Sequence, residues 1–560
     1  MIDNIEIKIN NNSGTKILKF ITSSITVFVG PNNSGKSTIL REIQKFCTSG
    51  QHNQNNILIN KISFKHPTTA DVSQNKKMML ATPTKDHNIQ PDHSLIKVPG
   101  STTSLHNNII DQLLTNPNKY TNNFCQFFLS NHTLILNSKN RTELTSPKSV
   151  GDLKAAPTSR IGTLFSNDSK REQIRKIVYE AFGKYLVIDP THLGELSFRL
   201  SDRAPNKIEQ ERGITSEAVD FHKRATPIEH ASDGVQAFTG ILTEIIAGEP
   251  QVLSIDEPEA FLHPSLSYKL GREIAKTSAD TKKRIFISTH SSDFVMGCIQ
   301  SGVPVNIIRL TYQNNSSTAR ILPNDKILNL MRNPLLRSTR VLQGLFYENV
   351  VVTEADSDRA FYQEINERLL MENDPRGISN CLFINAQNKQ TVPTIIEPLR
   401  NLGISAAGIV DIDILKDGGS TWSQHLRSIN LPEPLHQAYA DIRKKIKNYF
   451  VENNLDMKRN GGISLLDSAP QKASEELFDA LDSYGLFTIR LGELESWLKN
   501  LCASGHGPSW LIDVFEKMGE DPQSNKYVKP SSGDVWDFMG QLQKWFDNPN
   551  RKGIPTPKDS

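Results

Sequence analysis

The chain has few cysteines, and no two of them are close in sequence. Its five cysteines are Cys47, Cys125, Cys298, Cys381 and Cys502. The sequence contains no C-x-x-C pair, so it offers neither a zinc-binding spacing nor a redox motif. Sparse, isolated thiols are typical of a reducing compartment. We therefore expect no disulfide framework and no zinc site.

Long apolar runs and a strong net charge are also missing. No stretch approaches the roughly 20 apolar residues of a membrane-spanning helix, and the N-terminus is polar rather than signal-like. With 64 Lys and Arg against 61 Asp and Glu, the net charge is +3. This value neither indicates nor excludes a nucleic-acid partner, because local basic patches matter more than the sum. These properties predict a cytoplasmic protein without a membrane partner.

The most specific motif lies in residues 24–38. The apolar run Ile25–Val29 ends in a Gly-rich loop, and helix-forming residues follow it. This is the strand, loop and helix of the Walker A pattern G-x-x-x-x-G-K-[ST]. Such a loop surrounds phosphates with backbone amides at a helix N-terminus, where the dipole favours an anion. Lys36 would contact the outer phosphates and the Ser37 hydroxyl would bind Mg²⁺. The predicted nucleotide-binding residues here are Gly30, Asn32, Asn33, Gly35, Lys36, Ser37 and Thr38.

The segments around this motif differ in character. Residues 2–9 alternate apolar and polar side chains, and residues 16–20 form a second short apolar run, which predicts a hairpin leading into the Walker A strand. Residues 50–166 are rich in Asn, Thr, Ser, Lys and His. We predict that they form an insertion, part surface excursion and part small interaction or dimerisation module. Disorder is the alternative for residues 50–104. The apolar spacing in residues 171–183 predicts a helix capped by Gly183.

Three later segments add polar residues at the ends of apolar stretches. In residues 231–242, Ser232 and Gly234 open an apolar helix. Residues 251–264 contain a buried strand that ends in Asp256 and Glu257. A carboxylate at a strand end beside a P-loop can hold Mg²⁺ through water, and the next carboxylate can orient the attacking water. Residues 284–291 form another strand, which ends at His290.

In this order the four segments resemble an ABC-type ATPase. The segment at Ser232 is similar to the ABC signature, with Asp233 where glycine is common, and His290 occupies the switch-histidine position. The resemblance implies that ATP and Mg²⁺ bind, that Glu257 is catalytic, and that Ser232, Gly234 and Gln236 face the Walker A motif of a partner in a homodimer. Taken singly, Ser232 could be a simple helix N-cap and His290 a structural histidine. No Q-loop glutamine is placed.

The second half predicts alternating strands and helices, and hence a parallel sheet with a site at the carboxyl ends of its strands. Glu354 and Asp358 follow the strand that starts at residue 349, and Asp411 and Asp413 end a later strand. Residues i and i+2 of an extended chain point to the same side, so the two aspartates can share one metal. Carboxylate oxygens suit Mg²⁺ or Mn²⁺. The alternative is that these are ordinary solvated loop acids.

This acidic set resembles a TOPRIM domain, although Ala355 stands where that family often has glycine. An ABC-type ATPase followed by a TOPRIM domain is similar to the OLD (overcoming lysogenization defect) nucleases, which include the Gabija nuclease subunit and retron-associated effectors. The resemblance implies an α/β protein with an ATPase domain in residues 1–325, a helical connector in 326–346, and a TOPRIM domain with a helical extension in 347–560. The sequence itself predicts helices in residues 325–331 and 335–346.

The same resemblance implies further site residues. Glu493 and Glu495 would be second-metal ligands; the alternative is that they suit the dipole of a helix N-terminus. Lys529 is the candidate for a catalytic lysine, with Lys526 second, although most lysines of a polar loop are simply solvated.

The implied function is a metal-dependent DNA endonuclease, regulated by ATP binding and hydrolysis, in bacterial antiphage defence. It would act as a dimer or tetramer, with a defence-system protein or retron RNA or DNA as candidate partners. A second hypothesis makes the chain an ATP-driven sensor or scaffold whose TOPRIM-like half binds nucleic acid without cutting. A topoisomerase-like strand passer is a weaker third, because nothing marks a tyrosine nucleophile domain.

Overall fold

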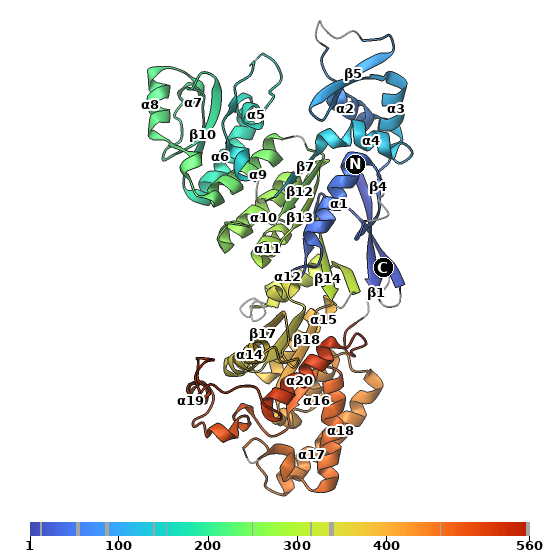
Figure 1. Cartoon of the computed structure of the whole chain (residues 1–560), viewed down its shortest axis with the longest axis vertical. Coiled ribbons are helices and arrows are strands. Elements are labelled where there is room, and N and C mark those ends of the chain that lie inside the picture. The colour runs from blue at the N-terminus through green and yellow to red at the C-terminus, as the bar shows by residue number, and fades with distance from the viewer. Residues whose placement is uncertain are drawn as a thin grey trace. The chain divides into compact units, whose positions relative to one another are not determined.

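The chain forms two compact units, Met1–Asn324 and Asp325–Ser560, shown in Figure 1. They divide one residue before the predicted boundary at residue 325. The computed structural model describes all residues except 12–13, 52–55, 84–88, 138–139, 153, 249, 280, 314–315, 335–340, 460 and 556–560.

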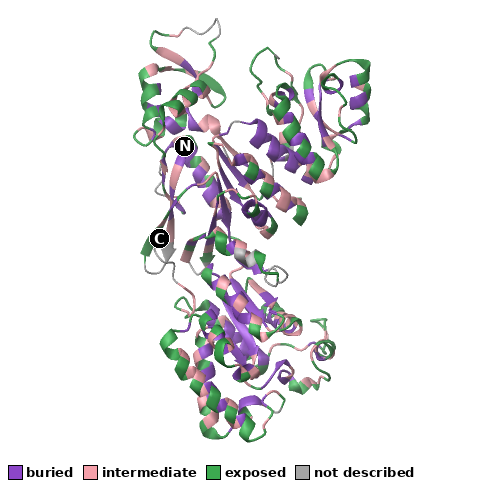
Figure 2. Cartoon of the chain, turned by 180° about the vertical axis from the view of Figure 1, so that it is seen from behind, coloured by how far each residue is buried: buried purple, intermediate pink, exposed green. Residues whose placement is uncertain are grey.

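The centre of the first unit is a six-stranded sheet with the order β15-β14-β3-β13-β12-β7. Its neighbouring strands are parallel except for the β14–β15 hairpin. The central strands are buried almost throughout (Figure 2), which is why the sequence shows them as continuous apolar runs rather than alternating ones. The strands are β3 (Ile25–Val29), β7 (Thr133–Leu136), β12 (Val252–Asp256), β13 (Arg284–Ser288), β14 (Val305–Gln313) and β15 (Ser316–Leu322).

Helices cover both faces of this sheet (Figure 1). Helix α1 (Lys36–Ser49) packs between it and a three-stranded antiparallel sheet, and Ile39, Ile43 and Phe46 share a buried core with both. The antiparallel sheet has the order β2-β1-β4, and its β1 (Ile2–Asn11) and β2 (Gly14–Ile21) confirm the predicted hairpin. The helices on the other face are α9 (Asp233–Ala247), α10 (Pro264–Ser278) and α11 (Ser292–Gln300).

The range 50–166, expected to be an insertion, contributes strands to both sheets. It contains β7 and also β4 (Ile59–Phe64), which pairs with β1. The start of β4 is fixed by Glu42, whose carboxylate accepts hydrogen bonds from the backbone amides of Ile57, Leu58 and Ile59. The described part of the range is packed on the unit's core rather than disordered. Its remaining elements include α2 (Thr69–Met79), β5 (His93–Val98), β6 (Ser101–His106), α3 (Asn107–Thr115) and α4 (Thr121–Phe127).

A smaller lobe lies between β7 and α9 in the chain. Its strands are β8 (Lys148–Ser149), β9 (Tyr185–Asp189), β10 (Glu195–Ser201) and β11 (Thr226–Pro227), and its helices are α5 (Arg160–Ser166), α6 (Asp168–Phe182), α7 (Ile208–Arg212) and α8 (Ser216–Arg224). Helix α6 ends at Gly183, which has φ 68°, as the sequence predicts. The buried Glu211 carboxylate pairs with Arg175 at 2.5 Å and with Arg171 at 3.2 Å, so this lobe is held together by a paired internal charge.

The second unit is built on a parallel four-stranded sheet with the order β17-β16-β18-β19. All its strands run the same way, so their carboxyl ends meet at one edge. The strands are β16 (Asn349–Thr353), β17 (Cys381–Asn385), β18 (Ser405–Asp411) and β19 (Leu486–Ile489). The main helices are α14 (Asp356–Met371), α15 (Val392–Asn401), α16 (Gly419–Ser428), α17 (His436–Glu452), α18 (Ser468–Ser483), α19 (Pro508–Met518) and α20 (Asp534–Asp547).

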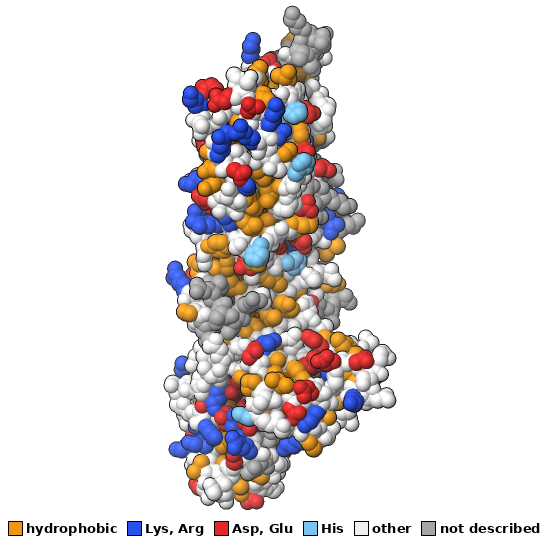
Figure 3. Space-filling model, turned by 90° about the vertical axis from the view of Figure 1, so that its left-hand side faces the viewer, with side chains coloured by type: hydrophobic (Ala, Val, Ile, Leu, Met, Phe, Trp, Pro, Cys, Tyr) orange, Lys and Arg blue, Asp and Glu red, His pale blue; other side chains and the backbone are white. Residues whose placement is uncertain are grey.

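The expected connector contains α12 (Asn324–Arg332) and a 3₁₀ segment, Val341–Phe346. Residues 335–340 of the predicted second helix lie outside the described residues. On the face drawn in Figure 3, Lys and Arg side chains are interspersed with Asp and Glu, in keeping with the small net charge. Within the part of the chain that the structure describes, none of the helices combines the length and apolar character needed to cross a membrane.

Candidate functional site

The loop between β3 and α1 has the backbone turns that its glycines allow. Gly30 has φ 143°, and a Cβ there would lie 2.0 Å from the Leu310 carbonyl oxygen. Gly35, the N-cap of α1, has φ 94°, and Asn33 has φ 60°. A larger residue at position 30 would collide with β14, so this glycine is required by close approach as well as by conformation.

Lys36 lies folded over this loop. Its ammonium donates hydrogen bonds to the carbonyl oxygens of Gly30 at 2.8 Å and Pro31 at 2.6 Å. Burial lowers the pKa of Lys36 to about 8, although Glu257 and Asp256 oppose the shift. Carbonyl dipoles compensate a positive charge less fully than a carboxylate does. The ammonium is therefore poised for a stronger anionic partner.

Asp256 lies where the ends of three parallel strands meet the loop. One of its carboxylate oxygens accepts a hydrogen bond from the Ser37 hydroxyl at 3.1 Å and another from the Ser288 hydroxyl. Ser288 is the register partner of Asp256 on β13. The structure thus brings together the two residues predicted to hold Mg²⁺, Ser37 and Asp256, from elements far apart in sequence.

Glu257 and His290 face each other beyond the ends of β12 and β13. His290 Nε2 lies 3.6 Å from Glu257 Oε1. Burial and the nearby Lys36 charge lower the pKa of His290 to about 4, so the imidazole is neutral at neutral pH and this contact is not an ion pair. The His290 backbone amide donates to Glu259 Oε1 at 2.8 Å, which fixes the histidine loop. Glu259 is a positioning residue that the sequence analysis missed.

The signature-like segment opens α9. Ser232 is the N-cap but makes no side-chain cap hydrogen bond, so the simple capping role is not what the structure shows. Its side chain is exposed, whereas Gly234 is buried and a Cβ there would lie 2.6 Å from the Phe261 carbonyl oxygen. Gln236 donates to the Ala231 carbonyl oxygen at 2.9 Å. Among the described residues, no hydrogen bond joins Ser232, Gly234 or Gln236 to the Walker A loop of the same chain.

Comparison with known proteins agrees with this geometry. Residues 146–297 match the family model "AAA domain, putative AbiEii toxin, Type IV TA system". The matched range contains the residues at the start of α9 and at the ends of β12 and β13, but not the Walker A loop. Together with the strand, Gly-rich loop and helix at residues 24–49, this match gives the first unit a P-loop ATPase fold. Among curated proteins, none matches the chain.

Several solved structures of SMC head domains are similar to the chain. An SMC head bound to the C-winged helix domain of ScpA is 15% identical, with a TM-score of 0.34, and the match covers 59% of this chain and 99% of that one. The SMC head domain from Thermotoga maritima is 13% identical, with a TM-score of 0.28, and covers 57% and 99%. A head domain with an extended coiled coil bound to the C-terminal domain of ScpA, derived from Pyrococcus furiosus, is 12% identical, with a TM-score of 0.32, and covers 59% and 98%. Similarity at this level carries no argument about function.

The second unit has an acidic centre at the carboxyl edge of its sheet. Glu354 follows β16, Asp411 ends β18, and Asp413 lies just beyond it. Carboxylate oxygens of these three residues all lie within 4.8 Å of one another. Glu354 Oε1 also accepts a hydrogen bond from the Asp411 amide at 2.8 Å. The sequence predicted that Asp413 belongs to the same strand as Asp411. Instead, the strand ends at Asp411 and Asp413 lies in the first turn of a 3₁₀ helix.

The environment of the acidic centre disfavours its negative charges. Burial, followed by the neighbouring Asp411 charge, raises the pKa of Glu354 well above its ordinary value. The same two causes raise the pKa of Asp358 to about 7. Burial also raises the pKa of Asp411, against the lowering effect of Lys458. Buried, mutually repelling carboxylates with compatible ligand distances fit a divalent cation, which would relieve both costs.

Two lysines missed by the sequence analysis supply positive charge to this centre. The Lys458 ammonium lies 2.8 Å from Asp411, 3.2 Å from Glu493 and 3.7 Å from Asp413. Lys389 lies 2.8 Å from Asp413. Burial opposes the charged form of Lys458, but Asp411 and the other carboxylates outweigh it and raise the pKa of that lysine.

The backbone that carries Lys458 is docked closely against the segment that carries Glu493. Gly492 has φ 137°, and a Cβ there would lie 2.0 Å from the Lys458 carbonyl oxygen. The glycine at position 492 indicates that some backbone lies very close to it. It does not indicate that this backbone belongs to Lys458.

Glu493 and Glu495 form a second acidic group with His506. Ligand atoms of these three residues lie within 4.8 Å of one another, and His506 Nδ1 is 2.6 Å from Glu495 Oε1. The expected amphipathic helix is only a 3₁₀ turn, Leu494–Ser496, and the Glu493 carboxylate caps it by accepting a hydrogen bond from the Ser496 backbone amide. His506 was not predicted from the sequence.

Lys529 does not join the acidic centre. Its side chain is 61% exposed and its ammonium lies 3.2 Å from Glu372 Oε1. Lys458 lies beside the acidic centre instead.

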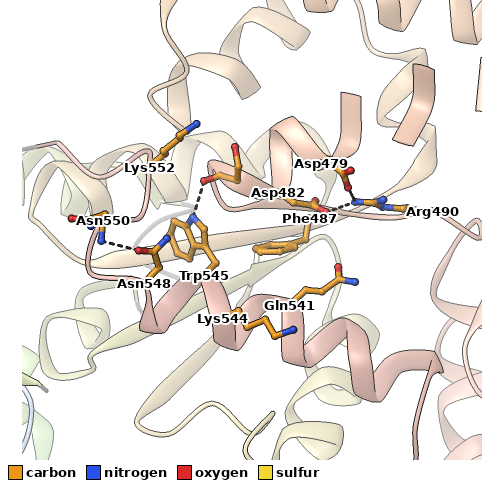
Figure 4. Close-up of a pocket in the computed structure, with 11 residues that line it drawn as sticks. Asp479, Asp482, Phe487, Arg490, Gln541, Lys544, Trp545, Asn548, Asn550 and Lys552 are labelled. Carbon is orange, nitrogen blue, oxygen red and sulfur yellow. Dashed lines mark hydrogen bonds and ion pairs between the residues drawn. The ribbon is translucent and has the colours of Figure 1, made fainter. Parts of the chain in front are cut away.

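The second unit also has an open pocket of about 500 Å³ (Figure 4). Figure 4 shows the aromatic side chains of Trp545 and Phe487 among the lining residues, with Arg490 turned toward Asp479 and Asp482. Arg490 is therefore paired, at 2.7 Å and 2.5 Å. None of the predicted site residues lines this pocket, so it is separate from the acidic centre. The lining residues are Asp479, Asp482, Ser483, Phe487, Arg490, Gln541, Lys544, Trp545, Asn548, Asn550 and Lys552.

Proposed function

We propose that this chain is a metal-dependent DNA endonuclease of the OLD type, in which an ABC-type ATPase domain controls a TOPRIM nuclease domain. The convergence of Glu354, Asp411 and Asp413 at the edge of a parallel sheet carries the nuclease part of this proposal. The resemblance to OLD nucleases supports a role in bacterial antiphage defence, with a defence-system protein or retron RNA or DNA as candidate partners.

In the ATPase domain the chain's own residues bind and orient the nucleotide. The loop amides and Lys36 would hold the phosphates, while Ser37 and Asp256 would hold Mg²⁺. Glu257 would orient the attacking water, and the neutral His290 could accept or donate a hydrogen bond near the outer phosphate. His290 and Glu257 lie 3.6 Å apart, and the Ser37–Asp256 hydrogen bond joins the Walker A loop to the residue before Glu257, which supports a shared site.

In the nuclease domain Glu354, Asp411 and Asp413 would hold Mg²⁺ or Mn²⁺, with Asp358 beside them. Glu493, Glu495 and His506 would hold a second ion. A bound divalent cation supplies charge neutralisation for the phosphodiester and activation of water. The high pKa of Asp358 suits a group that exchanges a proton near neutral pH. Lys458 and Lys389 keep the carboxylates together when no cation is bound.

Assembly as at least a homodimer is implied by the resemblance to ABC-type ATPases, and the exposure of the signature segment supports it. Ser232 is exposed, and Phe261, whose carbonyl oxygen lies against Gly234, is a 62% exposed aromatic residue. A partner's Walker A loop would cover both. Light scattering with ATP and the Glu257→Gln variant, which should bind without hydrolysing, tests this. A monomer under those conditions would contradict the proposal.

A plasmid assay tests the nuclease. Supercoiled DNA with Mg²⁺ or Mn²⁺ should become nicked or linear, and EDTA or the Asp411→Asn change should prevent it. Asp374→Asn is the matched control, because Asp374 pairs with Arg376 and not with the acidic centre. Cutting that persists in Asp411→Asn or in EDTA would overturn the proposal.

A second candidate function is favoured by one observation. Lys458 and Lys389 already offset part of the negative charge of the acidic centre. The TOPRIM-like unit could then act as a nucleic-acid-binding module in an ATP-driven sensor or scaffold. DNA binding without any product in the plasmid assay, at several millimolar Mn²⁺, would favour this alternative.

A further inference from the structure

Arg141 is a buried cation beside the ATPase site. It lies in the loop after β7, the edge strand that pairs with β12. Its side chain is 1% exposed, and among the described residues no carboxylate lies within ion-pair distance of it. Arg141 Nε donates to the Asn137 carbonyl oxygen at 3.1 Å, and Arg141 Nη1 donates to the Glu257 carbonyl oxygen at 2.5 Å. Burial lowers the pKa of Arg141, and the carboxylates of Glu259, Glu257 and Asp256 oppose that shift without pairing with it. A guanidinium buried among the acidic residues of the ATPase site, with hydrogen bonds to carbonyl oxygens alone, calls for an explanation beyond packing.

Glu257, which accepts a hydrogen bond from Arg141, has an unusual backbone conformation. Glu257 has φ 52°, in the left-handed region that a glutamate rarely adopts. Its amide donates to the Ser288 carbonyl oxygen at 2.9 Å, and its carbonyl accepts from the Ala260 amide at 3.0 Å as well as from Arg141. Both peptide groups of Glu257 are thus held from outside its own strand, which fixes the direction in which the side chain leaves the backbone.

The segment that carries Arg141 also packs on helix α9. A Cβ at Gly240 of α9 would lie 2.8 Å from Leu144 Cβ and 3.1 Å from the Arg141 carbonyl oxygen. The helix that begins with the signature-like residues therefore rests directly on the Arg141 segment. Arg141 therefore connects α9 to the Glu257 carbonyl, so a movement of α9 would change the position of that carbonyl.

We propose that Arg141 is a positioning residue for ATP hydrolysis, which holds Glu257 in its hydrolytic orientation and links that orientation to the position of α9. The inference rests on the proposed role of Glu257. Arg141 acts on the backbone of Glu257 from a buried position, so its loss should change turnover rather than nucleotide affinity.

The experiment measures steady-state hydrolysis and equilibrium binding of a fluorescent ATP analogue for Arg141→Met and Arg141→Lys. We expect kcat to fall roughly 10- to 100-fold in Arg141→Met, the scale of a misplaced catalytic group. The affinity for the analogue should stay within about twofold of the parent. Arg141→Lys, which retains a donor, should lose less and serves if Arg141→Met does not fold.

Arg284→Met is the matched control. Arg284 also donates to a backbone carbonyl oxygen, that of Ile2 at 3.1 Å. Arg284 is the first residue of β13 and pairs with Val252, which lies at the opposite end of β12 from Asp256. Its kcat should stay near that of the parent. In a Glu257→Gln background, adding Arg141→Met should cause little further loss, because the residue it positions is already gone.

An unchanged kcat in both Arg141 variants would overturn the inference. So would a parallel loss of affinity, or a full further loss in the Glu257→Gln background, because either would mean a structural role only. Parental hydrolysis by Glu257→Gln alone would instead remove the proposed role of Glu257, an outcome distinguishable from failure of the Arg141 inference.

Discussion

The two units each hold a lysine at their candidate site, and the two lysines are in opposite situations. In the ATPase unit Lys36 contacts neutral carbonyl oxygens, and burial lowers its pKa to about 8. In the second unit Lys458 contacts carboxylates, which raise its pKa despite burial. The described hydrogen-bond partners of Lys36 are thus neutral oxygens, whereas Lys458 lies within 4 Å of the carboxylates of Asp411, Asp413 and Glu493.

This difference separates two ways of preparing a charged site. In the Walker A loop the Lys36 ammonium contacts only neutral oxygens, so a phosphate can pair with it without displacing a carboxylate. The acidic centre stores excess negative charge with an internal counter-ion, so an incoming divalent cation must compete with Lys458. Substitution of the two lysines should therefore change ligand affinity in opposite directions.

The largest expected effect tests whether the two sites are chemically separate. Asp411→Ala should reduce plasmid cutting by at least about 100-fold, because it removes a ligand of the metal that neutralises the phosphodiester. Phosphate release from ATP should continue, because no ATPase site residue is altered. Both are measured on one preparation, with Asp374→Ala as control.

If Asp411→Ala cuts at the parental rate, the acidic centre is not the nuclease site. If ATP hydrolysis is lost as well, the thermal unfolding of the variant must match the parent before coupling is concluded.

Removal of the Walker A lysine should weaken nucleotide binding. Lys36→Met deletes charge-assisted hydrogen bonds to phosphate, each of about 1.5–3 kcal/mol, so we expect ATP affinity to fall roughly 10- to 100-fold. Equilibrium binding of labelled ATP measures it. Glu257→Gln is the companion variant, which should bind ATP normally and hydrolyse it poorly. Parental affinity in Lys36→Met would refute the nucleotide site.

Removal of Lys458 should have the opposite sign. Lys458→Met deletes the ammonium that competes with the cation, so we expect Mn²⁺ to bind roughly tenfold more tightly, as for loss of one close ion pair. Mn²⁺ binding is followed by electron paramagnetic resonance, without DNA. Lys529→Met is the matched control, because Lys529 pairs with Glu372 outside the centre. Weaker binding in Lys458→Met would show that the lysine supports the cation rather than opposing it.

A smaller effect comes from pH at the acidic centre. The pKa of Asp358 is raised to about 7, so protons compete with the cation below that pH. Mn²⁺ affinity should rise several-fold from pH 6 to pH 8. Asp358→Asn should flatten this dependence. A steep rise that is the same in Asp358→Asn would assign the proton to another carboxylate.

The smallest expected effect is the pH dependence of ATP binding. Lys36 loses its charge as pH rises through about 8 in the free protein, so ATP affinity should decline several-fold between pH 7 and pH 9. The neutral His290, with a pKa of about 4, should add no dependence between pH 6 and pH 8. Labelled ATP binding across this range measures both. A rise in affinity with pH would contradict the assigned state of Lys36.

The sequence alone was enough for features whose residues are contiguous. The Walker A strand, loop and helix occupy residues 24–38, and each glycine, the lysine and the serine have a fixed local geometry. The terminal carboxylates of β12 and β18 were also predictable. In parallel sheets the carboxyl ends of the strands meet at one edge. The prediction that Asp256 and Asp411 end strands was therefore enough to put each of them at the edge where the candidate site lies.

Range 50–166 shows where local pattern fails. Its strands β4 and β7 are too short to show a clear periodicity. They form because they pair with strands far away in the sequence, β1 and β12. Burial of Glu42 against the start of β4 and pairing of β7 with β12 are contacts across long stretches of chain. Composition suggested a surface excursion, but packing on α1 and the central sheets decided otherwise.

The residues that act by charge compensation were decided by the tertiary structure alone. Lys458, Lys389 and His506 stand in sequence contexts that resemble those of any solvated polar residue, and Lys529 was as good a candidate as Lys458. The same is true of Arg141, which acts through hydrogen bonds to backbone carbonyl oxygens rather than through an ion pair. A long cationic side chain has no local signature for its partner, because the partner's field depends on which strand ends and loops the fold brings within a few ångströms. The sequence determined which groups could carry the chemistry, and the fold decided which cations would face them.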